Sequence, residues 1–275
     1  MLIETLSTFP HMYDSVMGTS MMKIAQEKGK LEFVAYDLRD WTHDRHRTTD
    51  DDPYGGGAGL VMKCTPIFEA YEAITGCDIG FGPVVATGNE QPKTGPEPRY
   101  PNGNKPKTIF LTPCGQRFDD ALACELSRED RLLFVCGHYE GIDERAYELA
   151  DYQVSLGDYV LTSGELASMV MIDAIVRKID GVLGAEGGAL DESFAGGLLE
   201  YPQYTRPATA LGFSVPSVLT SGDHGAVAKW RREQSLERTA RLRPDLLQSA
   251  TLADGDLDYL ESLPYGMSGK ASGVS

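Results

Sequence analysis

The sequence predicts an α/β fold built on a parallel sheet, followed by a small, mostly helical domain. Within residues 1–180, short apolar runs alternate with helical patterns, which is typical of parallel βαβ units. Several of these runs are apolar without alternation, so we expect a sheet covered on both faces. Residues 201–262 carry helix signals but little strand signal. A chain of 275 residues, 41% of them hydrophobic, has enough apolar surface for both cores.

The expected strands of the first domain are rich in Val, Ile, Leu and Phe and are bounded by turn residues. They cover residues 2–7, 31–38, 82–87, 107–112, 131–137 and 151–157. Helical patterns separate the strands and cover residues 12–28, 66–74, 118–127, 142–150 and 164–179.

Changes in composition predict the domain boundaries. Residues 87–106 hold five prolines and three glycines, which indicates a mobile surface loop within an insertion at about 76–106. Residues 185–200 are glycine-rich and acidic, as expected of a linker. We therefore expect a first domain at 1–184, a linker at 185–200, a helical domain at 201–262 and a loose tail at 263–275.

Charge and cysteine usage limit the possible partners. The net charge of −16 argues against nucleic acid if it is averaged over the surface. Residues 201–245, however, carry seven Arg and Lys against four acids, a net charge of +3, so one face can still be basic. The five cysteines contain no C-x-x-C and predict reduced thiols in a cytoplasmic protein. No stretch approaches the roughly 18 apolar residues of a membrane span, so no membrane partner is expected.

Three glycine-containing segments follow predicted strands, where ligands bind in open parallel sheets. They read "LTPCGQ", "CGHYEG" and "LGDYVLTSGE". Neither G-x-G-x-x-G nor G-x-x-x-x-G-K-[ST] occurs, so a nucleotide held by its phosphates loses support. An adenosine-type ligand held by backbone loops remains possible. Ordinary turns with helix caps are the alternative for any single loop.

The stretch "HDRHRTTDDDPYGGGAGL", residues 43–60, joins dense charge to a run of glycines. Its basic side chains can contact phosphate and its tyrosine can stack on a base, so RNA binding is one reading. A metal site at His43 and His46 is a second reading, although the neighbouring arginines oppose a bound cation. A solvated mobile loop is the third.

Five ordered motifs resemble those of the bacterial tRNA (guanine-N1)-methyltransferase family, TrmD. They are the 43–60 stretch, "VCGHYEGIDER", "GDYVLTSGEL", "GVLG" followed by "DESF", and "YPQYTRP". The resemblance covers most of residues 1–250 outside the insertion. It implies a SPOUT-type α/β fold, a parallel sheet with a C-terminal trefoil knot, and a homodimer with active sites at the subunit interface. It also implies S-adenosyl-L-methionine as methyl donor, with possible use of Mg²⁺, and methylation of N1 of the guanosine at tRNA position 37.

The resemblance also assigns the donor site to the three glycine-containing segments. Position 114 is Cys in this chain, where relatives carry glutamine, so only a backbone contact is carried over there. The donor-binding residues implied are Thr112, Pro113, Gly137, Tyr139, Glu140, Gly141, Leu156, Gly157, Asp158, Tyr159, Val160 and Leu161.

In the family, the base that accepts the guanine proton is an aspartate just before Ser-Phe in the linker. This chain has Glu192 at that position, with Asp191 one residue earlier. We expect Glu192 to be the base because its spacing to Ser193-Phe194 is preserved, and Asp191 is the alternative. Arg177 is the cation expected near guanine O6, although an Arg at a helix C-terminus also offsets the helix dipole.

Two segments are expected to bind tRNA. The first is the 43–60 stretch and the second is the basic helical domain, in which two arginines seven residues apart share a helical face. The residues expected to contact tRNA are Arg45, His46, Arg47, Tyr54, Arg231 and Arg238. A SPOUT-class methyltransferase acting on ribosomal RNA, a non-catalytic RNA-binding protein on the same scaffold, and an adenosine- or NAD-type metabolic enzyme are the competing readings.

Overall fold

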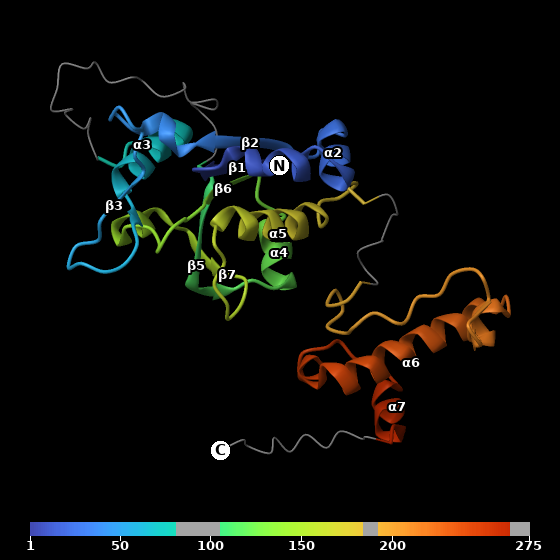
Figure 1. Cartoon of the computed structure of the whole chain (residues 1–275). Helices are drawn as coiled ribbons and strands as arrows, with labels where there is room; N and C mark the ends of the chain where they lie inside the picture. The colour runs from blue at the N-terminus through green and yellow to red at the C-terminus, as the bar shows by residue number, and fades with distance from the viewer. Residues whose placement is uncertain (81–104, 184–191, 265–275) are drawn as a thin grey trace. The chain divides into compact units, whose positions relative to one another are not determined.

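The computed structural model describes residues 1–80, 105–183 and 192–264 (Figure 1). The chain divides into two compact units, Met1–Gly184 and Ala185–Ser275. The strand expected at 82–87 and most of the insertion lie outside the described residues, as does the first part of the linker. In the parts of the chain that are described, no helix has the length and apolar character needed to cross a membrane.

The first unit is built on a five-stranded sheet in the order β2-β1-β6-β5-β7, in which every neighbouring pair is parallel. Ile3 pairs with Phe33 on one side and with Leu132 on the other. The predicted α/β class with a parallel sheet is therefore confirmed. The strands are β1 (Leu2–Ser7), β2 (Glu32–Asp37), β5 (Lys107–Arg117), β6 (Arg131–Val135) and β7 (Tyr152–Ser155).

Both faces of the sheet are covered, which explains the unbroken apolar strands. Along β6, Leu132 and Phe134 enter one hydrophobic cluster while Leu133 and Val135 enter the other. The first cluster is completed by α2 (Ser20–Glu27), α4 (Asp120–Leu126) and α5 (Gly164–Val176), and the second by α3 (Cys64–Thr75), η2 (Leu38–Trp41) and η3 (Glu144–Leu149). Figure 1 shows α3 on one side of the sheet and α4 and α5 on the other.

Two predicted helices differ from the structure. The helix expected at 12–28 is broken into η1 (Pro10–Tyr13), α1 (Asp14–Met17) and α2. The break lies at Thr19, whose backbone is extended, and at Ser20, which has a left-handed φ of 48°. The helix expected at 142–150 is the 3-10 helix η3.

The segment "LTPCGQ" was expected to be a loop after a strand, and this expectation is wrong. β5 continues through it to Arg117, with a register shift against β7 between Leu111 and Gln116. Gly115 permits this path, because a Cβ there would lie 2.4 Å from the Val154 backbone nitrogen. Thr112 and Pro113 therefore lie in an irregular part of a strand rather than in a turn.

Two short antiparallel pairs complete the strands. The pair β3 (Asp50–Asp51) and β4 (Val61–Met62) closes the glycine-rich end of the 43–60 stretch. The pair β8 (Thr209–Ala210) and β9 (Phe213–Ser214) belongs to the second unit.

The second unit is mainly helical in its described part. It contains α6 (His224–Leu242), α7 (Asp256–Ser262), η4 (Ser217–Thr220) and η5 (Pro244–Gln248). The side chain of Asp223 caps α6 by accepting from the Ala226 N–H at 2.9 Å. Leu198, Leu236 and Leu260 form its small buried core.

Candidate functional site

A cavity of about 440 Å³ lies against the irregular part of β5 and the carboxyl ends of β6 and β7. Four segments supply most of its lining, within residues 111–114, 137–142, 153–156 and 159–164. The cavity thus lies where an open parallel sheet exposes the backbone of its loops to ligands. Its volume falls in the usual range for small-molecule sites, roughly 300–1,000 Å³.

Most of the expected donor-binding residues line this cavity. Gly157 and Asp158 belong to the same loop but are not part of the lining. The expected residues that the structure brings together are Thr112, Pro113, Gly137, Tyr139, Glu140, Gly141, Leu156, Tyr159, Val160 and Leu161.

The cavity also has lining residues that the sequence reasoning did not assign to the site. His138 lies inside the quoted motif "CGHYEG". Ser163 directly precedes α5, where the sequence suggested only a helix cap. Ser163 is buried, and its hydroxyl makes no hydrogen bond to any residue that the structure describes. An orphan hydroxyl in a cavity wall is a ready partner for a bound polar group.

The segment after β6 and the start of α5 meet backbone to backbone. The Gly164 N–H donates to the Gly137 carbonyl at 2.8 Å. A Cβ on Gly164 would lie 2.7 Å from the Gly137 nitrogen and 2.9 Å from the Cys136 Cα. Since both contacts are to backbone, neither can give way, and glycine is required at position 164 for this approach.

Beyond this contact the 137–141 segment turns sharply. Tyr139 has a φ of 59° and Gly141 a φ of 141°, both in the left-handed region. The Glu140 N–H donates to the Leu60 carbonyl at 3.1 Å, and the Met62 N–H donates to the Gly141 carbonyl at 2.9 Å. The turn is therefore held from outside by Leu60, at the end of the 43–60 stretch, and by Met62 in β4.

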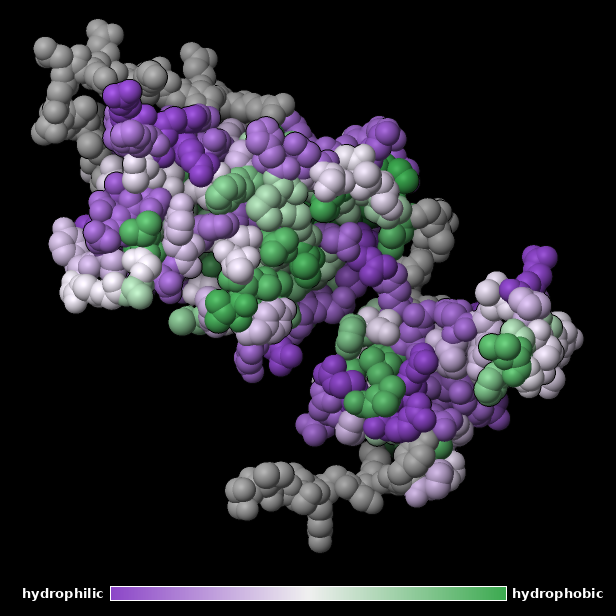
Figure 2. All heavy atoms as spheres, in the orientation of Figure 1, coloured by the Kyte–Doolittle hydropathy of each residue, from purple (hydrophilic) through white to green (hydrophobic). Residues whose placement is uncertain are grey.

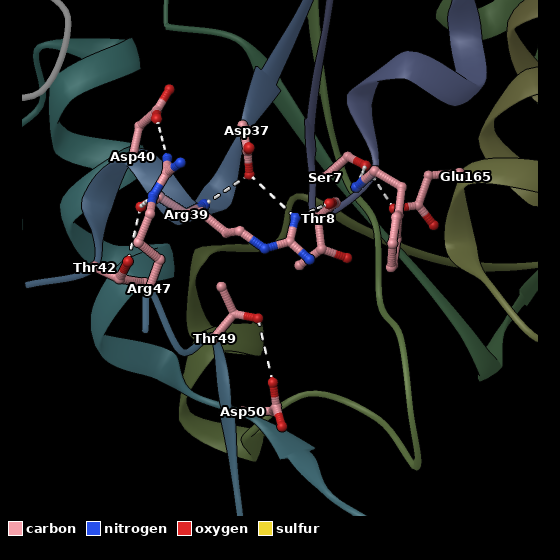
Figure 3. A network of polar contacts seen from close by, with 11 residues as sticks. Ser7, Thr8, Asp37, Arg39, Asp40, Thr42, Arg47, Thr49, Asp50 and Glu165 are labelled. Atoms are coloured by element: carbon pink, nitrogen blue, oxygen red, sulfur yellow. Dashed lines mark hydrogen bonds and ion pairs between the residues drawn. The ribbon is translucent and has the colours of Figure 1, made fainter. Parts of the chain in front are cut away.

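A buried polar cluster lies behind the cavity. The Ser7 hydroxyl donates to Glu165 Oε1 at 2.5 Å, as Figure 3 shows, and His138 Nδ1 lies 3.4 Å from Glu165 Oε2. The Tyr13 hydroxyl contacts Ser168 Oγ at 2.7 Å and Cys136 Sγ at 3.2 Å. Burial, and after it the charge of Cys136, raises the pKa of Tyr13. Burial, followed by the Glu165 charge, raises the pKa of Cys136 to about 12.

The charged part of the 43–60 stretch is ordered by Asp44 within it and by Asp40 just before it. Asp44 accepts from the backbone N–H groups of His46 and Thr48, at 3.0 and 2.9 Å. Arg47 pairs with Asp40 and donates to the Arg39 carbonyl, a network drawn in Figure 3. Arg45, His46 and Tyr54 are exposed, and Tyr54 is fully so.

The histidine pair of this stretch is divided between two roles. His43 Nε2 lies 2.6 Å from Glu69 Oε2 on α3, while the His46 side chain is exposed. Among the described residues, no group of three or more His, Cys, Asp or Glu is arranged to hold a metal ion. The described geometry therefore gives the His43 and His46 reading no support, and His43 serves to fasten the loop to α3.

The expected catalytic residues belong to different parts of the chain. Arg177 is the C-cap residue of α5 in the first unit. Glu192 belongs to the second unit, where it lines a cavity of about 320 Å³ together with Arg231 and Arg232. Asp191 lies outside the described residues.

The expected tRNA-binding arginines of the second unit lie along α6. The Arg231 guanidinium lies 4.8 Å from the centre of the Tyr201 ring and is exposed. Arg238 Nη1 donates to the Glu200 carbonyl at 3.0 Å, so it is half-buried. Arg232, which lies between them in sequence, forms an ion pair with Asp256, with Nη2 2.6 Å from Oδ2. Of these two expected residues, Arg231 thus presents the more accessible charge.

Comparison with known proteins gives one consistent result. The chain matches the family model described as tRNA (Guanine-1)-methyltransferase TrmD over residues 1–249. It is 48% identical over 264 residues to the tRNA (guanine-N(1)-)-methyltransferase of Geotalea uraniireducens strain Rf4, covering 96% of this chain and 97% of that protein. The protein of the same name from Limosilactobacillus fermentum is 47% identical over 96% of both chains. That from Geobacter metallireducens is 45% identical over 98% of this chain and all of the relative.

The cavity predicts a marked difference in thiol reactivity. Cys114 is exposed in the lining, whereas Cys136 is buried and, with a pKa of about 12, stays a protonated thiol at pH 8. We expect a disulfide reagent such as DTNB to modify Cys114 in the native protein and Cys136 only after unfolding. Peptide mass mapping of time points would measure both rates, with Cys114→Ser as control. Equal rates at the two positions would contradict the assignment.

Proposed function

This chain belongs to the tRNA (guanine-1)-methyltransferase family TrmD, and from that premise we propose how its residues bind the methyl donor and the RNA. It is a tRNA (guanine-N1)-methyltransferase, and the family implies use of S-adenosylmethionine. We propose that the substrate is the guanosine at tRNA position 37. The proposed donor binding is carried by one observation, the cavity that four segments line at the carboxyl edge of the parallel sheet.

The cavity suits S-adenosylmethionine in size and chemistry. About 440 Å³ accommodates a nucleoside joined to an amino acid. Its wall combines apolar side chains such as Ile142 and Ala167 with backbone groups of the glycine-containing segments. The buried Ser163 hydroxyl, orphaned within the described structure, supplies a polar partner. The full set of donor-binding residues predicted from the sequence stays part of this proposal, Gly157 and Asp158 included.

The fold proposal is more specific than the parallel sheet. We propose a SPOUT-class domain whose C-terminal segments, the ones that carry the donor-binding loops, form a trefoil knot. Support comes from the family and from the neighbouring positions of β6, β5 and β7 in the sheet. We further propose that residues 201–262 act as the tRNA-binding domain.

Methyl transfer requires that the guanine N1 lose its proton, because protonated N1 is a poor nucleophile. When bound, S-adenosylmethionine supplies a methyl group on a positively charged sulfur. We propose that Glu192 accepts the N1 proton, with Asp191 as the alternative base. Arg177 is proposed to face guanine O6, where negative charge grows as the proton leaves. The loops hold the two reactants in line, which is the main part of the catalysis.

The proposed RNA contacts come from both units. In the first unit Arg45 and His46 offer exposed groups to phosphate, Arg47 adds charge next to Asp40, and Tyr54 offers an unobstructed ring to a base. In the second unit Arg231 and Arg238 extend the contact along α6. Local positive charge of this kind is compatible with a net charge of −16.

A homodimer is supported by exposed apolar side chains next to the cavity. Val160 is 82% exposed and Val170 56%, and Tyr159, Leu161 and Leu166 are also exposed. Figure 2 shows a hydrophobic area over α5 on the first unit. Exposed apolar area of this kind is typical of protein interfaces. We propose that a second copy of the chain covers it and completes the active site.

Two further points are carried by the family alone. Use of Mg²⁺ finds no ligand cluster among the described residues, and no step here depends on it. A cytoplasmic location is proposed because bacterial tRNA is modified there. Three competing readings are not favoured: ribosomal RNA as substrate, a non-catalytic scaffold and a metabolic enzyme. The relatives that match over nearly their whole length are named as tRNA methyltransferases.

Replacing Glu192 tests the proposed base. Glu192→Gln keeps the shape but removes the carboxylate, and we expect single-turnover methyl transfer at saturating donor and tRNA to fall about 10²- to 10⁴-fold. Asp191→Asn is the matched control and should retain most of the rate. An unchanged rate in Glu192→Gln, with the loss appearing in Asp191→Asn, would move the role to Asp191.

Reversing charge on α6 tests the proposed RNA face. Arg231→Glu is expected to weaken tRNA binding and to flatten the dependence of log K on log salt by about one unit per lost phosphate contact. Fluorescence anisotropy with labelled tRNA across a salt series would measure both. Arg243 already forms an ion pair with Asp245. Arg243→Glu makes the same charge change elsewhere in the unit and should weaken tRNA binding less. If both variants weakened tRNA binding equally, the loss would reflect overall charge, and the proposed RNA face at Arg231 would be contradicted.

A further inference from the structure

Glu165 is a fully buried carboxylate directly behind the cavity wall. It lies in the first turn of α5, next to Gly164 and Ser163, which both line the cavity. The methyl-transfer chemistry proposed above does not use it. A buried carboxylate is strongly destabilising unless donors or a cation compensate it, so its partners are informative.

Two groups approach the Glu165 carboxylate, one at each oxygen. Ser7, the last residue of β1, donates to Oε1 at 2.5 Å. His138 Nδ1 lies 3.4 Å from Oε2, and each of these two atoms is buried without another hydrogen-bond partner among the described residues. The start of a helix adds a favourable field for the carboxylate.

The other ionisable groups around Glu165 do not offer it a cation. Tyr13 from η1 and Cys136 from the segment after β6 both interact with its charge, and both have a raised pKa that keeps them neutral near pH 7. Among the described residues, no Lys or Arg lies within ion-pair distance of Glu165. His138 is therefore the side chain suited to donate a hydrogen bond to Glu165 Oε2.

The His138 ring is held on its other sides by packing. Its centre lies 4.8 Å from that of Phe9 and 5.5 Å from that of Tyr139. Its backbone N–H contacts Met62 Sδ at 3.1 Å. The Arg39 guanidinium lies over the Phe9 ring, 5.2 Å from its centre. Arg39 also belongs to the polar network of Figure 3. The imidazole thus sits between the buried acid and the donor cavity that it lines.

We propose that Glu165 and His138 form a positioning pair for the methyl donor. Glu165 accepts the Nδ1–H of His138, and this contact keeps the 137–141 segment in its donor-binding shape. The segment needs such support because Tyr139 adopts a left-handed φ of 59°, which is unfavourable for a non-glycine residue. The inference rests on the proposed function in that the cavity is taken as the donor site.

A double-mutant cycle read out by donor binding tests the pair. Glu165→Gln removes the acceptor charge, and His138→Phe removes Nδ1 while it keeps a ring for Phe9 and Tyr139. By isothermal titration we expect each single variant to bind S-adenosylmethionine about tenfold more weakly, and the double variant to be no more than about twofold weaker than the worse single. The proposal would be overturned if the affinity losses of the single variants multiplied in the double variant. It would also be overturned if both single variants bound the donor as wild type does.

The demethylated product S-adenosylhomocysteine separates positioning from charge recognition. A positioning pair shapes the segment for both ligands, so both should lose affinity to a similar extent. If Glu165→Gln weakened only the cationic donor, the carboxylate would instead recognise the sulfonium, and the pair would be rejected. If the wild-type protein bound neither ligand, the proposed function itself would fail, which is a separate result.

Two controls exclude a general loss of structure. Ser168→Ala removes another buried hydroxyl of α5 that contacts Tyr13 but not His138, and it should bind the donor within about twofold of wild type. Nitrogen-15 NMR of the histidine rings should show a proton on Nδ1 of His138 in the wild type and its loss or shift in Glu165→Gln. This spectrum does not depend on donor binding. An imidazole protonated only on Nε2 in the wild type would contradict the proposed hydrogen bond.

Discussion

The close backbone contact between Gly164 and the segment after β6 is the constraint on which the candidate site depends. A side chain at position 164 would collide with the Gly137 nitrogen and the Cys136 Cα, at 2.7 and 2.9 Å. The absence of a Cβ lets α5 begin directly beneath the 137–141 segment. Three consequences follow: the Gly164 N–H reaches the Gly137 carbonyl, Ser163 enters the cavity wall, and Glu165 is carried into the core below His138.

Burial then determines what the polar groups behind the cavity can do. Tyr13 and Cys136 are neutral because burial disfavours their charged forms, so they pack and hydrogen-bond rather than react. Glu165 remains the acid of this cluster, with Ser7 and His138 at its two oxygens. A buried, polar-bonded wall of this kind suits a transfer reaction in which the protein chiefly holds two reactants in line.

The sheet could be predicted because parallel strands buried on both faces read as continuous apolar runs, as in 131–135. The continuation of β5 could not, since it depends on Gly115 approaching β7, a tertiary contact with no local signal. The break near Thr19 lies in the backbone conformation of Thr19 and Ser20, which a helical periodicity does not reveal. The family motifs pointed to residues that line the cavity, whereas Glu165 was not singled out because its partner Ser7 lies 158 positions away in sequence.

The most direct test of the account is donor binding by Gly164→Ala, measured by isothermal titration with S-adenosylmethionine. The added methyl group must push the 137–141 segment away from α5, so the account predicts a loss of affinity of about tenfold or more in a protein that remains folded. Gly196→Ala, where a Cβ meets nothing within 4 Å, is the control and should bind as wild type does. Wild-type affinity in a folded Gly164→Ala protein would contradict the claim that this backbone contact shapes the donor site.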